Sequence, residues 1–354
     1  MVATVEEHRV GGLRWTIVCG PREEAFARLG EYAAADIEAV LDELPGRAGL
    51  ASRARRAPLL YRAVEATSRA GHRDAVAELA ALAKGAGVPF DDLLLVNLRG
   101  DLGIGDGTGC TDLAWGGQRS LIGHNEDGAP VFDGRGGLLT LLLDGEPGVC
   151  VWWYPGFVPA NTFTVTARGM VWGIDHVGVV RPMPGAGRHF VARTLQSAGS
   201  IAGVVEHLHR NPSAGGFAYT AGQVGVPGVT VIETAGAQLA VTPVPEGFFW
   251  HTNHLRRLPP DLDTAAEESL IRAEVCARLR PDAPDAGWML EALTRKPVPD
   301  GLHRDATGDD ELMTLSTLVA DLHDGVVTLQ ARGGRPLQAT VADLAAGVVG
   351  GLTE

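Results

Sequence analysis

Cysteine is scarce in this sequence, and its spacing excludes two roles. The 354 residues hold four cysteines, too far apart for a disulfide framework or a paired-cysteine zinc site: Cys19, Cys110, Cys150 and Cys276. No apolar run approaches the ~20 residues that cross a bilayer. Residues 1–20 place Glu6, Glu7 and Arg9 before any apolar stretch, unlike a secretory signal. We therefore expect a cytoplasmic protein without a membrane partner, in which the Cys110 thiol stays reduced.

Positive charge is also in short supply. The formal net charge is −13 and the pI about 5.3, which argues against nucleic acid as a partner. The main basic run, Arg53–Arg56, has no wider basic or aromatic stripe beside it and is interpreted as a solvated helix end. With 45% hydrophobic residues, the chain is long enough to bury roughly 75% of its unfolded surface.

Residues 1–109 read as mainly helical. A strand pair is predicted first, at Val5–Arg9 and Leu13–Val18. Apolar periodicity then predicts three helices, at Arg22–Leu44, Arg55–Ser68 and Arg73–Lys84. A fourth helix is predicted to run to Asn97, with Asp91 as its N-terminal cap. The glycine-rich stretch Gly100–Gly109 ends this helical part, and we expect it to be a flexible, exposed loop.

From Cys110 onward, short β-type segments predominate. Glycine, proline and acidic turns separate the predicted strands: Thr111–Trp115, Ser120–His124, Leu138–Leu143, Val149–Tyr154, Thr162–Ala167, Met170–Ile174, Val229–Glu233, Leu239–Thr242 and Phe248–Thr252. Helices are predicted at His189–Asn211, Ala265–Arg280 and Trp288–Thr294. Because strands and helices occur in separate runs, the pattern favours an α+β fold with antiparallel sheets covered by helices.

The Gly109–Cys110 bond has the features of a self-cleavage junction. A thiol is a strong nucleophile once a base removes its proton, and a cysteine at a new N-terminus carries its own base, an α-amine of pKa about 7.7–8.0. Glycine has no Cβ, so Gly109 can adopt the distorted backbone that attack on its carbonyl requires. The alternative interpretation is a buried cysteine in a glycine-rich turn.

Asp127 and Asn253 are the residues expected to assist Cys110. Asp127 lies seventeen residues after Cys110, and an outward and a return strand would bring its carboxylate back beside the start of the first strand. Asn253 follows an apolar strand and could donate to a developing oxyanion. Alternatively, Asp127 belongs to an ordinary turn and Asn253 only ends its strand.

Six short segments, in this order, resemble one enzyme family: Asp92–Asp101, Gly109–Thr111, Gly123–Asp127, His251–His254, Ser269–Arg272 and Thr314–Thr317. The chain resembles the acyl-coenzyme A:6-aminopenicillanic acid acyltransferase family, the C45 autoproteolytic acyltransferases and hydrolases of the N-terminal nucleophile (Ntn) superfamily. The resemblance spans most of the chain.

The resemblance implies a four-layer αββα fold and an enzyme made as a precursor. A helical segment, residues 1–109, would be cut from a catalytic chain, residues 110–354, and the two would form one globular unit. Cys110 would be the nucleophile, with Asp127 supporting its amine and Asn253 serving the oxyanion hole. The substrate would be a small-molecule amide or acyl thioester, resolved by water or an acceptor amine without a metal or organic cofactor; a homo-oligomer is compatible with this.

Three residues near the proposed site depart from the family pattern. Glu126 stands where the family commonly has an aromatic residue, and His124 where related bile-salt and penicillin V hydrolases carry arginine. Asp175 occupies the place of an asparagine assigned to the oxyanion hole, so its carboxyl group would have to be protonated or turned away. With Asn125, His124 and Asp175 are predicted substrate contacts.

Other functions are weighed against this one. A phosphate-binding loop at Gly103–Gly109 lacks the Lys-Ser/Thr ending and the preceding strand. A metal site at His251 and His254 would need ligands from opposite faces of one strand. A catalytically silent, uncleaved Ntn-fold protein with a binding or assembly role is the alternative from a different class.

Overall fold

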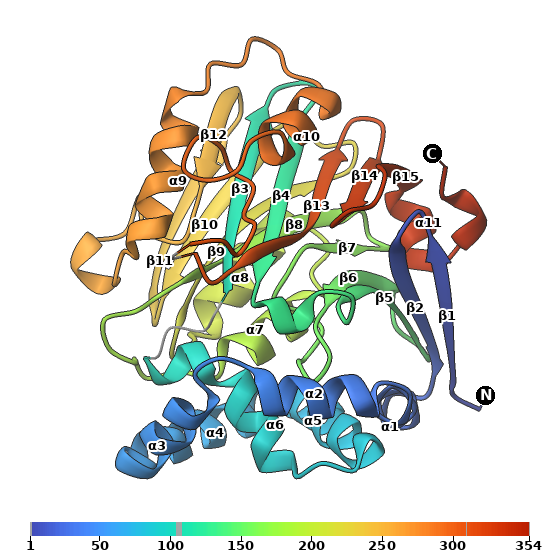
Figure 1. Cartoon of the computed structure of the whole chain (residues 1–354), viewed down its shortest axis with the longest axis vertical. Helices are drawn as coiled ribbons and strands as arrows, with labels where there is room; N and C mark the ends of the chain where they lie inside the picture. The colour runs from blue at the N-terminus through green and yellow to red at the C-terminus, as the bar shows by residue number, and fades with distance from the viewer. Residues whose placement is uncertain (1, 104–107, 309, 354) are drawn as a thin grey trace.

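In the computed structural model, which describes residues 2–103, 108–308 and 310–353, two β-sheets lie face to face (Figure 1). The larger has the strand order β1-β2-β5-β6-β7-β8-β9-β10-β11, with these bounds: Thr4–Val10, Leu13–Gly20, Gly137–Leu143, Val149–Trp153, Thr164–Thr166, Met170–Val177, Gly216–Gln223, Val229–Ala235 and Gln238–Val244. The smaller has the order β12-β3-β4-β13-β14-β15: Gly247–His251, Thr108–Gly116, Leu121–Gly128, Met313–Asp321, Val326–Ala331 and Leu337–Thr340. Neighbouring strands are antiparallel except β2 and β5, which run parallel.

The two sheets approach closely at glycines. A Cβ on Gly173 of β8 would lie 2.4 Å from Asp112 Oδ1 of β3, and one on Gly222 of β9 would lie 3.4 Å from Ile122 Cδ1 of β4. Side chains of the smaller sheet therefore fill the space that these glycines leave.

Helices cover the outer sides of both sheets. On the smaller sheet, α9 (Glu267–Arg278) and α10 (Ala286–Thr294) bury an apolar cluster that includes Leu113, Val275 and Leu293. Helices α1 to α8 cover the larger sheet, and α1–α6 are grouped at the base of the view in Figure 1. Their bounds are Arg22–Tyr32, Ala34–Glu43, Arg47–Arg56, Pro58–Gly71, Arg73–Ala86, Phe90–Asn97, Arg188–Leu195 and Ile201–Arg210. A last helix, α11 (Val341–Ala346), packs on β5–β7 beside β15. The predicted α+β fold, with two stacked sheets flanked by helices, is confirmed.

Most predicted elements are present, with corrections at their boundaries. The strand pair β1–β2 is confirmed, but the helix predicted over Arg22–Leu44 is interrupted at Ala33, and the one over His189–Asn211 is divided before Ser200, whose side chain caps α8. Asp91 lies in the first turn of α6, which Pro89 precedes as the N-cap, so its predicted capping role is wrong. The basic run does lie at a helix end, but it ends α3, which was not predicted, and the helix predicted from Arg55 begins at Pro58.

The stretch predicted as an exposed loop at Gly100–Gly109 begins differently. Residues Arg99–Leu102 form a buried 3₁₀ turn, in which Asp101 accepts the backbone N–H groups of Arg188 and Gly215 at 3.0 and 2.8 Å. Exposure of this part was therefore a wrong expectation, because the carboxylate is held inside by backbone donors. Residues 104–107 of the same stretch lie outside the described residues. They make up most of the segment Gly103–Gly109, which was considered above as a phosphate-binding loop.

Candidate active site

The antiparallel pair β3–β4 organises the site. Its register places Gly109 opposite Asp127, Cys110 opposite Glu126, and Asp112 opposite His124. This is the predicted hairpin, with the Asp127 carboxylate returned to the start of β3. Because side chains alternate along a strand, the two strands present one set of residues to the larger sheet and another to α9 and α10.

On the helix side, Asn253 faces the nitrogen of Cys110. The Cys110 backbone N–H donates to Asn253 Oδ1 at 3.0 Å, and Arg272 Nη2 donates to the same oxygen at 2.6 Å. The amide nitrogen of Asn253 donates to the His176 carbonyl oxygen at 2.9 Å. Two donors on one side and an acceptor on the other fix the orientation of this amide, with its oxygen toward Cys110.

Arg272 of α9 joins several of these groups. Its guanidinium donates to the Cys110 carbonyl oxygen, to Thr111 Oγ1 at 2.7 Å and to the Glu268 carboxylate. Burial alone would lower the pKa of Arg272, but the charges of Glu268 and Asp127 outweigh it and raise that pKa, so the side chain stays cationic. A buried cation thus lies against the first residue of the proposed catalytic chain.

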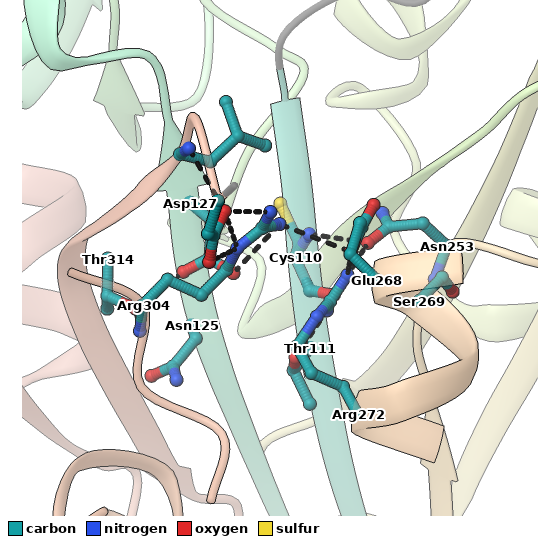
Figure 2. Close-up of polar contacts among 12 residues, drawn as sticks. Cys110, Thr111, Asn125, Asp127, Asn253, Glu268, Ser269, Arg272, Arg304 and Thr314 are labelled. Atoms are coloured by element: carbon teal, nitrogen blue, oxygen red, sulfur yellow. Dashed lines mark hydrogen bonds and ion pairs between the residues drawn. The ribbon is translucent and has the colours of Figure 1, made fainter. Parts of the chain in front are cut away.

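Asp127 lies across Cys110 from Arg272 (Figure 2). Thr314 Oγ1 donates to its Oδ1 at 2.7 Å, and Arg304 Nη1 lies 4.0 Å from its Oδ2. Burial raises the pKa of Asp127 to about 6, although Arg304 and Arg272 act to lower it. Within the described part of the chain, Asp127 Oδ2 accepts no hydrogen bond. One carboxylate oxygen is therefore available near the start of β3.

Close contacts leave little room for a side chain at Gly109. A Cβ at this position would lie 2.4 Å from Arg304 Nη1 and 3.3 Å from Asn253 Oδ1. A larger residue would displace the arginine that faces Asp127. Glycine at this position is therefore favoured by its backbone freedom and also by this lack of space.

On the opposite face, the Cys110 thiol meets a buried acid and base network. Cys110 Sγ donates to Glu126 Oε1 at 3.9 Å, and Tyr154 Oη donates to the same oxygen at 2.6 Å. His124 bonds Glu126 Oε2 through Nε2 at 2.9 Å and Asp112 Oδ1 through Nδ1 at 2.6 Å. Cys110, Asp112, His124 and Glu126 are each at most 2% exposed.

Burial and charge set the protonation of this network. Burial, reinforced by the Glu126 charge, raises the pKa of the Cys110 thiol well above its usual value. Burial would lower the pKa of His124, but the adjoining carboxylate of Asp112 and further hydrogen bonds raise it well above its usual range. The ring is therefore an imidazolium held between two carboxylates, and the thiol carries its proton.

A second acid and base pair lies between the sheets next to the first. His251 Nδ1 bonds Asp175 Oδ2 at 2.8 Å, and His251 Nε2 lies 3.4 Å from Glu233 Oε1. Burial raises the pKa of Asp175, and the nearby Asp112 raises it further. Burial would lower the pKa of His251, but its hydrogen bonds to Asp175 and Glu233 raise that pKa to about 9.

The predicted substrate contacts all lie inside the protein. Asn125 donates to the carbonyl oxygens of Leu293 and Leu302, at 2.9 and 3.3 Å, and accepts from Thr317 Oγ1 at 2.6 Å. These bonds tie β4 to α10 and the segment that follows it. His124 and Asp175 are both fully buried in the networks just described, so a substrate role for any of the three remains a prediction.

Two groups of side chains have metal-ligand chemistry and share His124. The donor atoms of Cys110, His124 and Glu126 lie within 4.8 Å of one another, as do those of Asp112, His124 and Asp175. Both ring nitrogens of His124 already bond carboxylates, and its raised pKa favours the imidazolium, which is not a metal ligand. The two histidines weighed earlier have separate partners, Asp175 for His251 and Ser269 for His254.

Comparison with known proteins identifies the family. A sequence model of the acyl-coenzyme A:6-aminopenicillanic acid acyl-transferase family matches residues 115–336, well over half of the chain. The chain belongs to this family. The predicted membership is confirmed, and with it the prediction of an enzyme of the hydrolase or acyltransferase class. The matched segment begins just after Cys110, which it does not contain.

Solved structures give a more distant likeness. Penicillin V acylase from Agrobacterium tumefaciens is 13% identical, with a TM-score of 0.38 over 65% of this chain and 86% of that one. A mutant of conjugated bile acid hydrolase from Clostridium perfringens is 12% identical, with a TM-score of 0.41 over 65% of this chain and 92% of that one. Likenesses of this size carry no argument about function. No protein in the curated set matches the chain.

Several residues of the site escape sequence reasoning. Arg304 and Asp112 belong to none of the segments that carried the resemblance, and Tyr154 was predicted only as the last residue of a strand. Arg272 lies in one of those segments, and its spacing of three from Ser269 on a helix was a usable signal, since both side chains face inward and are fully buried.

Among the helices of the described ranges, none has the length and hydropathy of a membrane span.

Proposed function

We propose that the chain is an autoproteolytic N-terminal-cysteine amidohydrolase or acyltransferase with Cys110 as its nucleophile. The observation that carries the proposal is the two-sided setting of Cys110. Its nitrogen faces Asn253 Oδ1, within a frame made by Arg272 and Asp127, while its sulfur faces a separate network across the strand. Cleavage between Gly109 and Cys110 would turn that nitrogen into an amine.

The new amine would act as the general base of turnover. Asn253 Oδ1 already accepts from this nitrogen, and the free oxygen of Asp127 gives an ammonium form a counter-charge. The thiolate would attack an amide or thioester carbonyl, and the amine would pass its proton to the leaving group. Water or an acceptor amine would then resolve the acyl-enzyme.

In the uncut chain, Asn253 does not have the oxyanion-hole role that the sequence analysis expected. Its NH₂ group donates to the His176 carbonyl oxygen, so it is not available to an oxyanion in this state. We propose that Asn253 first orients the Cys110 nitrogen. Its oxyanion role in turnover would require the amide to release His176.

Cleavage would also open the site. Thr108 and Gly109 extend β3 and pair with Gly128 and Asp127, directly before a thiol that is 2% exposed. Release of this strand end after cleavage would uncover Cys110 for small-molecule substrates. The two fragments, residues 1–109 and 110–354, would stay together because β2 pairs with β5.

The test is the chemistry of the thiol. Wild-type protein incubated with a panel of small acyl amides and acyl thioesters should form a covalent acyl adduct on Cys110 and release the amine or thiol product. Cys110→Ala should show neither, while Cys150→Ala, which alters another buried cysteine, should retain both. An adduct on another cysteine, or a silent wild-type protein, would contradict the proposal.

A further inference from the structure

Self-cleavage needs a base for the Cys110 thiol other than the α-amine, because that amine forms only when the chain is cut. Before cleavage, the Cys110 nitrogen is a peptide amide and cannot accept the thiol proton. The thiol is buried, and the pKa of Cys110 is raised well above its usual value by that burial and by the Glu126 charge. A thiolate formed by simple ionisation would therefore be rare at neutral pH, so the first step needs a base in contact with the sulfur.

The strand register places a carboxylate at that position, beside His124, whose raised pKa keeps its ring protonated and so unable to accept the proton. Cys110 and Glu126 are directly opposite each other in β3 and β4, so their side chains leave the same face of the sheet. The thiol donates toward Glu126 Oε1 at 3.9 Å, a distance suited to a weak S–H hydrogen bond. Asp127 lies one residue further along β4, and its carboxylate bonds Thr314 on the helix side.

The neighbours of Glu126 hold it in place. Tyr154 Oη donates to Oε1 at 2.6 Å and His124 Nε2 bonds Oε2 at 2.9 Å. Asp112, the next cross-strand partner along the same face, anchors the other nitrogen of His124 at 2.6 Å. Both carboxylate oxygens are therefore fixed, and Oε1 is directed at the sulfur.

We propose that the Glu126 carboxylate is the general base that takes the Cys110 thiol proton while the chain is uncut, with Tyr154 and the His124–Asp112 pair as positioning residues. The inference rests on the self-cleavage proposed above.

The proton balance of the step is complete. Glu126 takes the thiol proton as Sγ bonds to the Gly109 carbonyl carbon. The C–N bond to Cys110 then breaks, and Glu126 returns the proton to the departing nitrogen, leaving a thioester and a free amine. Water hydrolyses the thioester to the Gly109 carboxylate and the Cys110 thiol, and the proton that the new carboxylic acid loses passes to the free amine. Because proton transfer neutralises Glu126, the thiolate does not face a charged carboxylate as it forms.

The primary test compares full-length wild type with Glu126→Gln by time-resolved intact mass. At pH 7, Glu126→Gln should be cut at least about 100-fold more slowly, the usual contribution of a positioned base. Its residual rate should rise about tenfold per pH unit, because thiolate must then form by ionisation. Wild-type cleavage should vary little near neutrality. Hydroxylamine, which cleaves thioesters, should leave Glu126→Gln whole.

Glu78→Gln is the matched control. Glu78 is a buried carboxylate in the helical layer, paired with Arg193 at 2.8 Å and remote from β4. This variant should lose stability but be cut at the wild-type rate. Equal cleavage of wild type and Glu126→Gln, or hydroxylamine cleavage of Glu126→Gln, would overturn the role of Glu126. An uncut wild type would instead contradict the self-cleavage itself.

Tyr154→Phe tests the same role if Glu126→Gln does not fold. The titratable groups facing Glu126 are Cys110, Tyr154 and His124, with Asp112 behind the histidine and Asp127 next along the strand. Removing the Tyr154 hydroxyl deprives the carboxylate of a donor, so the pH below which cleavage slows should move upward by about one unit. A purely structural role would slow cleavage without moving that pH, and this result would overturn the proposal.

Discussion

At the residue scale, the site divides according to the alternation of side chains along β3 and β4. The nitrogen of Cys110 belongs to a frame of Asn253, Arg272 and Asp127, whereas its sulfur belongs to Glu126. One residue can thus use different partners for self-cleavage and for turnover. This division follows from period-two geometry and strand register alone.

Arg272 should be irreplaceable by lysine. Its planar guanidinium reaches the Cys110 carbonyl, Thr111 and Asn253 together, which a single ammonium cannot do. We expect Arg272→Lys to lower the free energy of unfolding by about 3 kcal/mol, because partners of a buried charge are left unpaired. Self-cleavage should slow in parallel.

Urea unfolding and intact mass measure the two effects. Arg278→Lys is the control, since Arg278 is an exposed residue in the last turn of the same helix. It should change stability by less than about 0.5 kcal/mol and leave cleavage unaltered. If Arg272→Lys behaves like this control, the guanidinium does not organise the site.

The sequence predicts the position of a site residue better when that residue lies close to Cys110 along the chain. Asp127 could be placed beside the start of β3 because a hairpin links it to Cys110 within seventeen residues. The position of Asn253 near Cys110 was available only through the family resemblance, and the direction of its amide was not predictable. That direction depends on Arg272 and the His176 carbonyl, which tertiary packing brings from other elements.

At the element scale, the helical layer depends on one very close crossing. Gly30 of α1 and Gly85 of α5 let the two backbones meet, and a Cβ on Gly85 would lie 1.9 Å from the Ala27 carbonyl oxygen. That oxygen is backbone and cannot move aside cheaply. The crossing sets the position of α5, which carries Glu78 to its partner Arg193 on α7.

Gly85→Ala should therefore be strongly destabilising. Separating the two helices is an overpacking effect that costs about 3 kcal/mol, at the upper end for such changes. Gly71→Ala, in the last turn of α4 with open space around its Cβ, should be neutral or stabilising by up to about 1 kcal/mol. Equal midpoints for the two variants in urea unfolding would disprove the tight crossing.

Element prediction succeeded where a local pattern decides and failed where packing decides. The strands at Leu138–Leu143 and Met170–Ile174 were recognised from apolar runs. Helix breaks at Ala33 and before Ser200 were missed, because the apolar period continues through them while the chain turns to follow the layer. The strands β9 and β13–β15 were not predicted either.

At the scale of the whole molecule, the parallel pairing of β2 with β5 joins residues before Cys110 to those after it. Such a contact between distant segments leaves no local signature, so the sequence did not predict it. The two sheets and their covering helices confirmed the fold class, which did not depend on this detail. The boundary at Cys110 remains a proposal about processing.

Acid should destabilise the folded chain through His72, which joins α4 and α5 and whose Nδ1 lies 2.8 Å from Thr194 Oγ1 of α7. Burial, with the nearby His207, lowers the pKa of His72 to about 4. The unfolded residue has a pKa near 6.5, so between these values the unfolded state binds the additional proton. The free energy of unfolding should therefore fall as the pH falls through this window, by about 2 kcal/mol at pH 5.

His72→Gln isolates this contribution, because Asp127, with its raised pKa of about 6, acts in the opposite direction over the same window. Chemical denaturation at pH 7 and pH 5 should show a loss about 2 kcal/mol greater for wild type than for the variant. Identical losses would show that His72 is not the titrating group.

The central claim is that Cys110 becomes a free N-terminus, and the most direct measurement is N-terminal identification of the fragments in purified wild-type protein. We predict two chains, residues 1–109 and 110–354, with the second beginning at Cys110. A single unsplit chain, or a new N-terminus at any other residue, would contradict the account.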